Sequence, residues 1–309
     1  MTSHNWLATL NAALADSHPP VVTDMPAHPS VFIVGAPRSG TTILSQYLAA
    51  SFDVGYVNNL MACFWNAPVY GALLARKLTP HRQVSTVSEF GATPHITDPH
   101  EFGAFWRTML AYQGMQQRPD IEPDALQNLA DTLDQVSRVF GQPVVYKVYQ
   151  LAWHIQEFQR VRPASRWLWV KRDVEDNALS LLRFRRKMHG DDSQWVSSLP
   201  LAALSEEFPD RYHEVVFQVL AINEWLGRSL GAIDRSRWAT VDFSTFVSQP
   251  GSCHEALEAL CGAVDTDASR RFADGVVAPA TRHSDADVAG VRSAIAHYAS
   301  LPRWQDSLS

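Results

Sequence analysis

A strand, a glycine-framed turn and a helix follow one another directly near the start of this chain. Residues 31–42 read VFIVGAPRSGTT. The four apolar residues at 31–34 predict a buried strand of a parallel sheet, because such a strand is covered on both faces. Gly35 and Gly40 frame a turn, and residues 41–51 have a helical pattern. This order predicts an α/β fold.

Strands and helices alternate along the rest of the chain. Apolar runs predict further strands at 144–147, 166–170 and 238–241. Periodic apolar residues predict helices over 123–140, 176–187, 212–230 and 254–260, and mostly helical structure with core-forming aromatic stripes over 58–87 and 99–117. Such an alternation is typical of a parallel β-sheet flanked by helices.

Residues 1–30 are predicted to be an N-terminal helix and linker. Apolar spacing predicts a short helix over 5–16, and four prolines between residues 17 and 30 predict the linker. No internal repeat or second linker follows. We therefore predict one α/β domain over 31–309.

Composition narrows the class of protein. The chain has 309 residues, 46% of them apolar, which is enough to form a core and too apolar for a disordered chain. The formal net charge of −6 argues against nucleic acid or an acidic membrane as a partner. Cys63, Cys253 and Cys261 form no CxxC pair, so neither a zinc site nor a disulfide framework is predicted. With no apolar run of about 18 residues and no secretory leader, we expect a cytoplasmic protein.

The turn at residues 35–42 has the spacing of a P-loop. Its glycines allow the backbone to turn tightly around an anion, and successive N–H groups and the helix N-terminus attract that anion. Thr41 stands where the Walker-type loop has a lysine, and the cation of this loop is Arg38. A guanidinium can hold a tetrahedral anion through two hydrogen bonds. The sequence therefore predicts an anion site in a P-loop-type sheet.

The same loop resembles that of a known family. Pro37, Arg38, Ser39, Gly40, Thr41 and Thr42 resemble the 5′-phosphosulfate loop of sulfotransferases that use PAPS (3′-phosphoadenosine-5′-phosphosulfate). The protein-tyrosine type and many bacterial members have Arg at the position of Arg38. The resemblance implies that these six residues bind PAPS, that no metal is required, and that a sulfuryl group is transferred to a hydroxyl or amine.

A second motif follows the strand predicted at 166–170. Arg172 and Ser180 resemble the strand-end Arg and the helix Ser that hold the 3′-phosphate of PAPS in this superfamily, although Val174 replaces the usual Pro. A cation and a hydroxyl at the carboxyl edge of a sheet can converge on one phosphate. Four cations follow, and we expect them to line a solvated helix face: Arg183, Arg185, Arg186 and Lys187.

Two further stretches resemble the superfamily more loosely. Lys147 ends the strand at 144–147, where the superfamily has a lysine that approaches the leaving phosphate. Residues 239–250 resemble its late strand, with an acidic residue and a loop ending in Pro. The family's general bases do not carry over, since Tyr149 occupies the position of a His in one branch. In another branch a Glu lies where this chain has Asn58-Asn59.

The remaining candidates for the general base cluster at residues 93–101, TPHITDPHE. We favour Glu101, with His100 second, over His95 and Asp98. Glu101 is expected to open an aromatic helix, where partial loss of solvent would make it a better base, and bacterial sulfotransferases have an acidic residue at a similar place. The alternative is a helix-start carboxylate that only complements the helix dipole.

Two other functions fit the sequence less well. In a P-loop NTPase or small-molecule kinase, Thr42 would bind Mg²⁺ and Asp173 would be the second acid. The missing P-loop lysine and the pair of Arg172 and Ser180 argue against it. The chain could also be a non-catalytic nucleotide-binding protein. The acceptor stays open among small-molecule, lipid, carbohydrate and peptide classes.

Overall fold

The protein is built on one parallel five-stranded sheet. In the computed structural model the described residues are 4–17, 21–79, 84–85, 88, 93–118, 120–262 and 283–304. Their strands are β1 (Ser30–Val34), β2 (Gly55–Tyr56), β3 (Val144–Lys147), β4 (Ser165–Lys171) and β5 (Trp238–Asp242), in the order β2-β3-β1-β4-β5. Every neighbouring pair is parallel. The predicted α/β fold class is confirmed.

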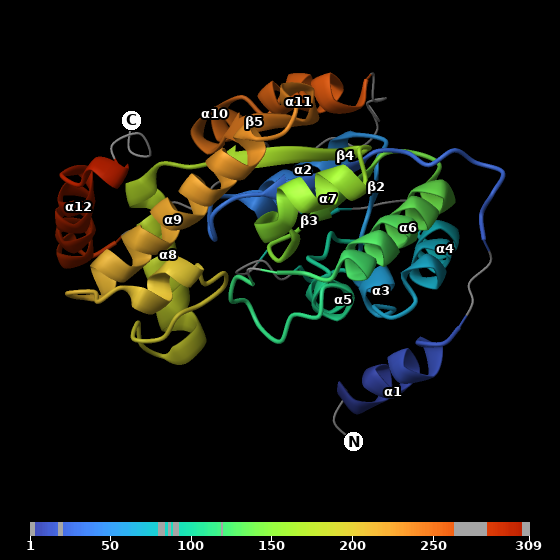
Figure 1. Ribbon diagram of the computed structural model, residues 1–309, viewed down its shortest axis with the longest axis horizontal. Coiled ribbons are helices and arrows are strands. Elements are labelled where there is room, and N and C mark those ends of the chain that lie inside the picture. Colours follow the sequence, from blue (N-terminus) through green and yellow to red (C-terminus); the bar gives the residue numbers. More distant parts are fainter. Residues whose placement is uncertain are drawn as a thin grey trace.

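Helices cover both faces of the sheet (Figure 1). One face packs against α2 (Thr41–Ser51), α10 (Phe243–Ser248) and α11 (Ser252–Cys261). The other packs against α5 (Gly103–Met109), α6 (Pro123–Phe140), α7 (Ile155–Val161), α8 (Val174–His189) and α9 (Arg211–Gly231). The short α3 (Asn59–Ala62) precedes α4 (Pro68–Leu78), which packs on α6.

The alternation of side chains along β1 explains the two cores. Phe32 and Val34 belong to the larger hydrophobic cluster, whereas Val31 and Ile33 belong to the smaller one on the opposite face. Phe32 packs against the Trp167 ring with centroids 4.8 Å apart. Both faces are buried, so β1 reads as a continuous apolar run in the sequence.

The strand order places a crevice at the carboxyl ends of β1 and β4. The chain leaves β1 towards β2 on one side and leaves β4 towards β5 on the other, while β1 and β4 are neighbours. In open parallel sheets ligands bind where the strand order reverses in this way. The 35–42 loop and the residues that follow β4 therefore meet at this point.

Several predicted elements need correction. Only Gly103–Met109 is helical within 99–117, because Phe102 and Ala111 on either side have φ angles of 56° and 52°. Part of 58–87 lies outside the described residues, and the rest holds α3 and α4. The predicted loop within 239–250 contains α10, which Asp242 caps by accepting a hydrogen bond from the Thr245 N–H. The strand β2, at two residues, is too short to give a sequence pattern.

The N-terminal helix α1 (His4–Leu14) docks on the turn between α3 and α4. The buried Asn11 donates to the carbonyl of Cys63 at 2.8 Å and accepts from the Asn66 N–H at 2.9 Å. The division of the chain into 1–30 and 31–309 stays a prediction. Residues 18–20, 263–282 and 305–309 lie outside the described part of the chain.

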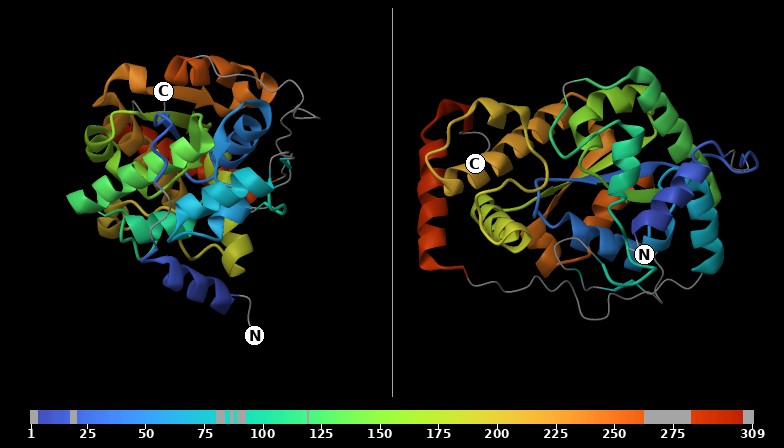
Figure 2. Two further views of the ribbon diagram at one scale, coloured as in Figure 1. Left: turned by 90° about the vertical axis from the view of Figure 1, so that its right-hand side faces the viewer. Right: turned by 90° about the horizontal axis from the view of Figure 1, so that it is seen from below.

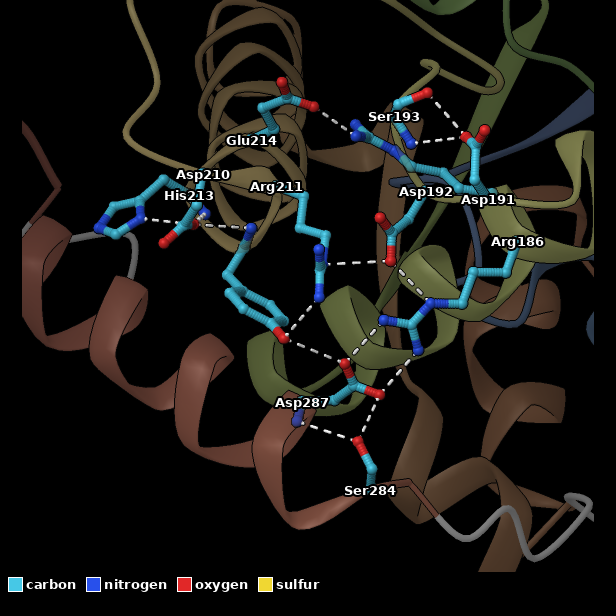
Figure 3. Close-up of polar contacts among 12 residues, drawn as sticks. Arg186, Asp191, Asp192, Ser193, Asp210, Arg211, His213, Glu214, Ser284 and Asp287 are labelled. Atoms are coloured by element: carbon cyan, nitrogen blue, oxygen red, sulfur yellow. Dashed lines mark hydrogen bonds and ion pairs between the residues drawn. The ribbon is translucent and has the colours of Figure 1, made fainter.

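The C-terminal helix α12 (Asp285–Ala299) packs on α8 and α9 at one end of the molecule (Figure 2). Arg186 of α8 makes two hydrogen bonds of 2.8 Å to the Asp287 carboxylate, and Asp192 pairs with both Arg186 and Arg211 (Figure 3). Arg185 is fully buried and pairs with Glu214 of α9. The expected solvated face was therefore wrong for Arg185, which α9 covers, whereas the Arg186 side chain stays 38% exposed beside Asp287.

The three cysteines are free thiols. Cys253 and Cys261 lie on α11, where burial raises the pKa of Cys253 to about 12 and that of Cys261 to about 11. Within the described residues, no helix is both long and apolar enough to cross a membrane.

Candidate active site

The 35–42 loop needs glycine at both ends for different reasons. A Cβ on Gly35 would lie 2.8 Å from the Val170 carbonyl oxygen of β4, so the loop could not approach the neighbouring strand. Gly40 has φ of 106°, and a Cβ there would meet the Phe243 ring at 2.2 Å. The two glycines thus let a tight loop sit directly over the sheet edge.

Side chains from α8 and from the end of β4 donate hydrogen bonds to carbonyl groups of this loop. Asn177 is fully buried and its Nδ2 donates to the Pro37 carbonyl. Arg172 donates from Nη1 to the Arg38 carbonyl at 3.0 Å. Arg38 in turn places its Nε 3.4 Å from the Ser180 hydroxyl oxygen. Arg38 therefore connects the two motifs, since it contacts both Arg172 and Ser180.

Polar atoms of the loop and of its neighbour Arg172 are buried without a hydrogen-bond partner among the described residues. Ser39 Oγ and Arg172 Nε are two of them. In the same part of the structure, no side chain caps the N-terminus of α2 at Gly40. Buried donors without partners carry a desolvation penalty of about 1–3 kcal/mol each, which a bound anion removes. The site thus fits a phosphate-like group at the loop.

The electrostatics of Arg38 and Arg172 also favour a bound anion. Loss of solvent lowers the pKa of Arg38, and the nearby Arg172 lowers it further. Loss of solvent also lowers the pKa of Arg172, while Asp176, 4.0 Å away, acts in the opposite direction. The Arg172 guanidinium lies over the Phe243 ring, 4.7 Å from its centroid. Two like charges that lie close together and have lost solvent favour binding of a multiply charged anion.

Lys147 joins the loop to the predicted base. It lies at the end of β3, buried, and its ammonium donates to the Thr42 hydroxyl and to the Glu101 carboxylate. Burial alone would lower the pKa of Lys147, but the Glu101 carboxylate and Tyr149 outweigh it and raise that pKa above its ordinary value. Lys147 thus links the Thr42 hydroxyl of the loop to the Glu101 carboxylate.

Glu101 differs from its predicted setting. It lies two residues before α5 rather than in its first turn, and its side chain is 37% exposed. Glu101 is thus partly buried, and it lines the cavity while it pairs with Lys147.

A cavity of about 330 Å³ opens beside the loop. Pro37 and Arg38 of the loop line it together with Glu101 and Lys147. The rest of its lining comes from Met115, Tyr149, Phe184, Met188, His189, Trp195, Val196 and Ser197. The predicted loop cation, strand-end lysine and carboxylate thus share one concave site.

Two of the other candidate bases, His100 and Asp98, make structural hydrogen bonds. His100 accepts the Phe102 N–H at Nδ1 and does not line the cavity. Asp98 is fully buried and accepts the backbone N–H groups of Ser85 and His95. Asn58 caps α3 by accepting the Met61 N–H.

Three residues of the site were missed or set aside by sequence reasoning. Tyr149, set aside because it is no histidine, lines the cavity and has its hydroxyl 3.4 Å from that of Thr41. Asn177 lies one helical turn before Ser180, a spacing that places both on one face of α8. Phe243 directly follows β5 and so lies at the carboxyl edge of the sheet. Its position after a predicted strand could have identified it from the sequence.

No group of three or more metal-binding side chains gathers anywhere in the part of the chain that the structure describes. A cationic, glycine-framed loop at the point where a parallel sheet reverses its strand order is typical of anion-binding α/β proteins.

The family follows from comparison with known proteins. The sequence model of the sulfotransferase family matches residues 29–267, and the chain belongs to this family. This membership makes it a transferase enzyme. No curated protein sequence matches the chain.

Solved structures share the fold at low identity. The crystal structure of sulfotransferase STF1 from Mycobacterium tuberculosis H37Rv aligns with a TM-score of 0.54 at 14% identity, over 93% of this chain and 81% of that one. Sulfotransferase STF9 from Mycobacterium avium aligns with a TM-score of 0.51 at 14% identity, over 93% of this chain and 72% of that one. These matches support the same overall architecture.

Proposed function

We propose that this protein transfers a sulfuryl group from PAPS to a hydroxyl or amine of a small acceptor. The observation that carries the proposal is the contact of Arg38 with both Arg172 and Ser180. These residues come from two distant motifs, each matched to one end of a nucleotide with both a 3′-phosphate and a 5′-phosphosulfate.

The donor would lie along the carboxyl edge of β1 and β4. The 35–42 loop, with its glycines and the α2 N-terminus, suits the 5′ end, and Ser39 Oγ would gain a partner there. Arg172 and Ser180 suit the 3′-phosphate. When bound, PAPS supplies the sulfuryl group, whose bond to the bridging oxygen of the 5′-phosphate breaks as the new bond to the acceptor forms.

Lys147 and Glu101 suit the two charge changes of this transfer. Lys147 touches Thr42 of the loop and can stabilise negative charge that develops on the bridging oxygen. Glu101 faces the cavity and can accept the proton of the acceptor hydroxyl or amine. Because the transferred group carries less negative charge than a phosphoryl group, these cations can serve without a metal ion.

Transfer of label from [³⁵S]PAPS to acceptor mixtures in the presence of EDTA tests the proposal. We expect labelled product and an equal amount of 3′,5′-adenosine bisphosphate (PAP). Glu101→Gln should lower turnover while PAP affinity stays near that of the wild type. Glu207→Gln serves as control, because Glu207 is an exposed carboxylate that does not line the cavity.

Two results would contradict this function. Activity that requires ATP and Mg²⁺ and stops on chelation would make the protein a kinase or NTPase. PAP binding without any sulfated product across phenol, alcohol, sugar, amine and peptide acceptors would make it a nucleotide-binding protein. Normal turnover in Glu101→Gln would move the base to another residue.

A further inference from the structure

The cavity wall beyond the proposed reacting groups is mostly apolar. Apart from Arg38, Lys147 and Glu101, the lining consists of aromatic, thioether and aliphatic side chains, with Tyr149, His189 and Ser197 as its polar members. Trp195 and Val196 come from the segment after α8, whereas Phe184 and Met188 come from α8 itself. A polyhydroxylated sugar would leave many of its hydroxyls unpaired against such a wall.

A buried polar cluster holds the 195–198 segment from behind. Gln218 of α9 is fully buried, and its Nε2 donates to the Val196 carbonyl at 2.9 Å and to the Ser198 carbonyl at 2.6 Å. Its Oε1 accepts from Arg185 Nη2 at 3.2 Å. The amide thus fixes the backbone on both sides of Ser197.

Arg185 extends this support to the indole ring. Its guanidinium is fully buried, pairs with Glu214 and lies 4.8 Å from the centroid of the Trp195 ring. Figure 3 shows Glu214 projecting from its helix towards a guanidinium. A cation over an indole face is attracted by the ring electrons, so Arg185 fixes the plane of Trp195.

The backbone of the segment is strained at the cavity. Ser197 has φ of 62°, a left-handed conformation that costs a non-glycine residue roughly 1 kcal/mol or more. Such strain persists only where the surroundings hold it, and the two hydrogen bonds from Gln218 do so. A backbone pairing also ties Leu199 to Met115, another lining residue, through an N–H to carbonyl bond of 3.0 Å.

We propose that the 195–198 segment is the acceptor-recognition wall, that it takes a flat, uncharged aromatic alcohol, and that Arg185 and Gln218 are the positioning residues that set it. The chemistry rests on the proposed sulfuryl transfer. The aromatic ring of the acceptor would lie between Trp195 and the side chains of Phe184 and Met188, and its hydroxyl would point to Glu101. The cavity volume suits one small fused ring system.

The test compares 2-naphthol with methyl glucoside and glucosamine, in binding and in transfer. Calorimetry in the presence of PAP should show saturable binding of 2-naphthol and none of the sugars. Trp195→Ala should raise the KM for 2-naphthol by at least about tenfold, with the KM for PAPS within about twofold of wild type, and Trp195→Phe should recover most of the loss.

Gln218→Met tests the positioning role, since it keeps the volume and removes both donors. We expect a similar rise in the acceptor KM without a change in PAP affinity, whereas Gln127→Met, an exposed amide on α6, should change neither. A merely structural role would lower stability but leave the acceptor KM of the folded enzyme unchanged. If Gln218→Met does not fold, the comparison of Trp195→Ala with Trp195→Phe tests the acceptor wall instead.

The outcomes separate this inference from the function on which it rests. Transfer to sugars with no binding of 2-naphthol overturns the aromatic wall and leaves the sulfotransferase activity intact. An unchanged acceptor KM in Trp195→Ala would also overturn the aromatic wall without affecting the proposed sulfuryl transfer. Saturable binding of 2-naphthol that weakens in Trp195→Ala supports the wall even if PAPS proves not to be the donor.

Discussion

Removal of the Arg172 guanidinium should weaken binding of PAP far more than binding of AMP, which lacks the 3′-phosphate. Arg172 already donates from Nη1 to the Arg38 carbonyl, while its Nε is buried without a partner among the described residues. The 3′-phosphate is the group that would satisfy this donor. Arg172→Ala therefore removes an interaction that only PAP makes.

The size of the effect follows from the number of charged hydrogen bonds lost. One such bond contributes about 1.5–3 kcal/mol, which is about 10- to 150-fold in affinity. Loss of the bond to Arg38 and of the Phe243 contact changes the loop for both nucleotides. The difference between the two affinity losses isolates the interaction with the 3′-phosphate.

Isothermal titration of wild type and Arg172→Ala with PAP and with AMP, in EDTA, measures this difference. Lys171→Ala is the matched control, because Lys171 is the neighbouring exposed cation and lies over Trp169, whereas Arg172 lies over Phe243. Equal losses for PAP and AMP would show that Arg172 only supports the loop and would refute its role at the 3′-phosphate.

Three further predictions concern the loop, the C-terminal helix and pH. Gly40→Ala should lower stability by about 1–3 kcal/mol and weaken PAP binding, because its Cβ clashes with Phe243 at a positive φ. Asp287→Ala should lower the free energy of unfolding by about 2–4 kcal/mol, since it removes two charged hydrogen bonds from Arg186. His154, whose pKa burial lowers to about 4, should make unfolding easier by up to about 3 kcal/mol as the pH falls from about 6.5 to 4.

Urea unfolding measures the stability change in each of these three predictions, and calorimetry measures PAP binding by the Gly40→Ala variant. Gly231→Ala, where a Cβ meets nothing within 4 Å, should be close to neutral, and equal behaviour of both glycine variants would contradict the loop argument. Hydrogen bonds from Arg186 lower the pKa of Asp287, so the Asp287→Ala deficit is present above about pH 4 and shrinks below it. Above the pKa of the unfolded state, His154 is neutral in both the folded and the unfolded protein, so His154→Gln should matter only at lower pH. If His154→Gln shows the same loss of stability with falling pH as the wild type, His154 is not the source of that loss.

The sequence predicted the sheet and its loop well for a physical reason. Strands buried on both faces leave apolar runs, and the 35–42 loop carries its glycines in consecutive sequence, so each is visible locally. The family resemblance singled out Arg172, and the carboxyl-edge rule agrees with its position near the loop. The residues that depend on local pattern were thus predictable.

Features set by tertiary contact were not predictable. Arg185 looks like a solvated helix residue until α9 supplies Glu214 and Gln218 against it. Glu101 was expected to be desolvated by aromatic neighbours, yet its partner, Lys147, lies 46 residues away in the chain. Ser197 adopts a left-handed conformation, although the 195–198 segment contains no glycine that would signal one.

A crystal structure of the enzyme with PAP tests the central claim most directly. The account predicts one nucleotide along the carboxyl edge of β1 and β4, with its 5′-phosphate in the 35–42 loop and its 3′-phosphate within hydrogen-bond distance of Arg172 and Ser180. A nucleotide bound with its 3′-phosphate away from both residues, or at another place on the molecule, would contradict it.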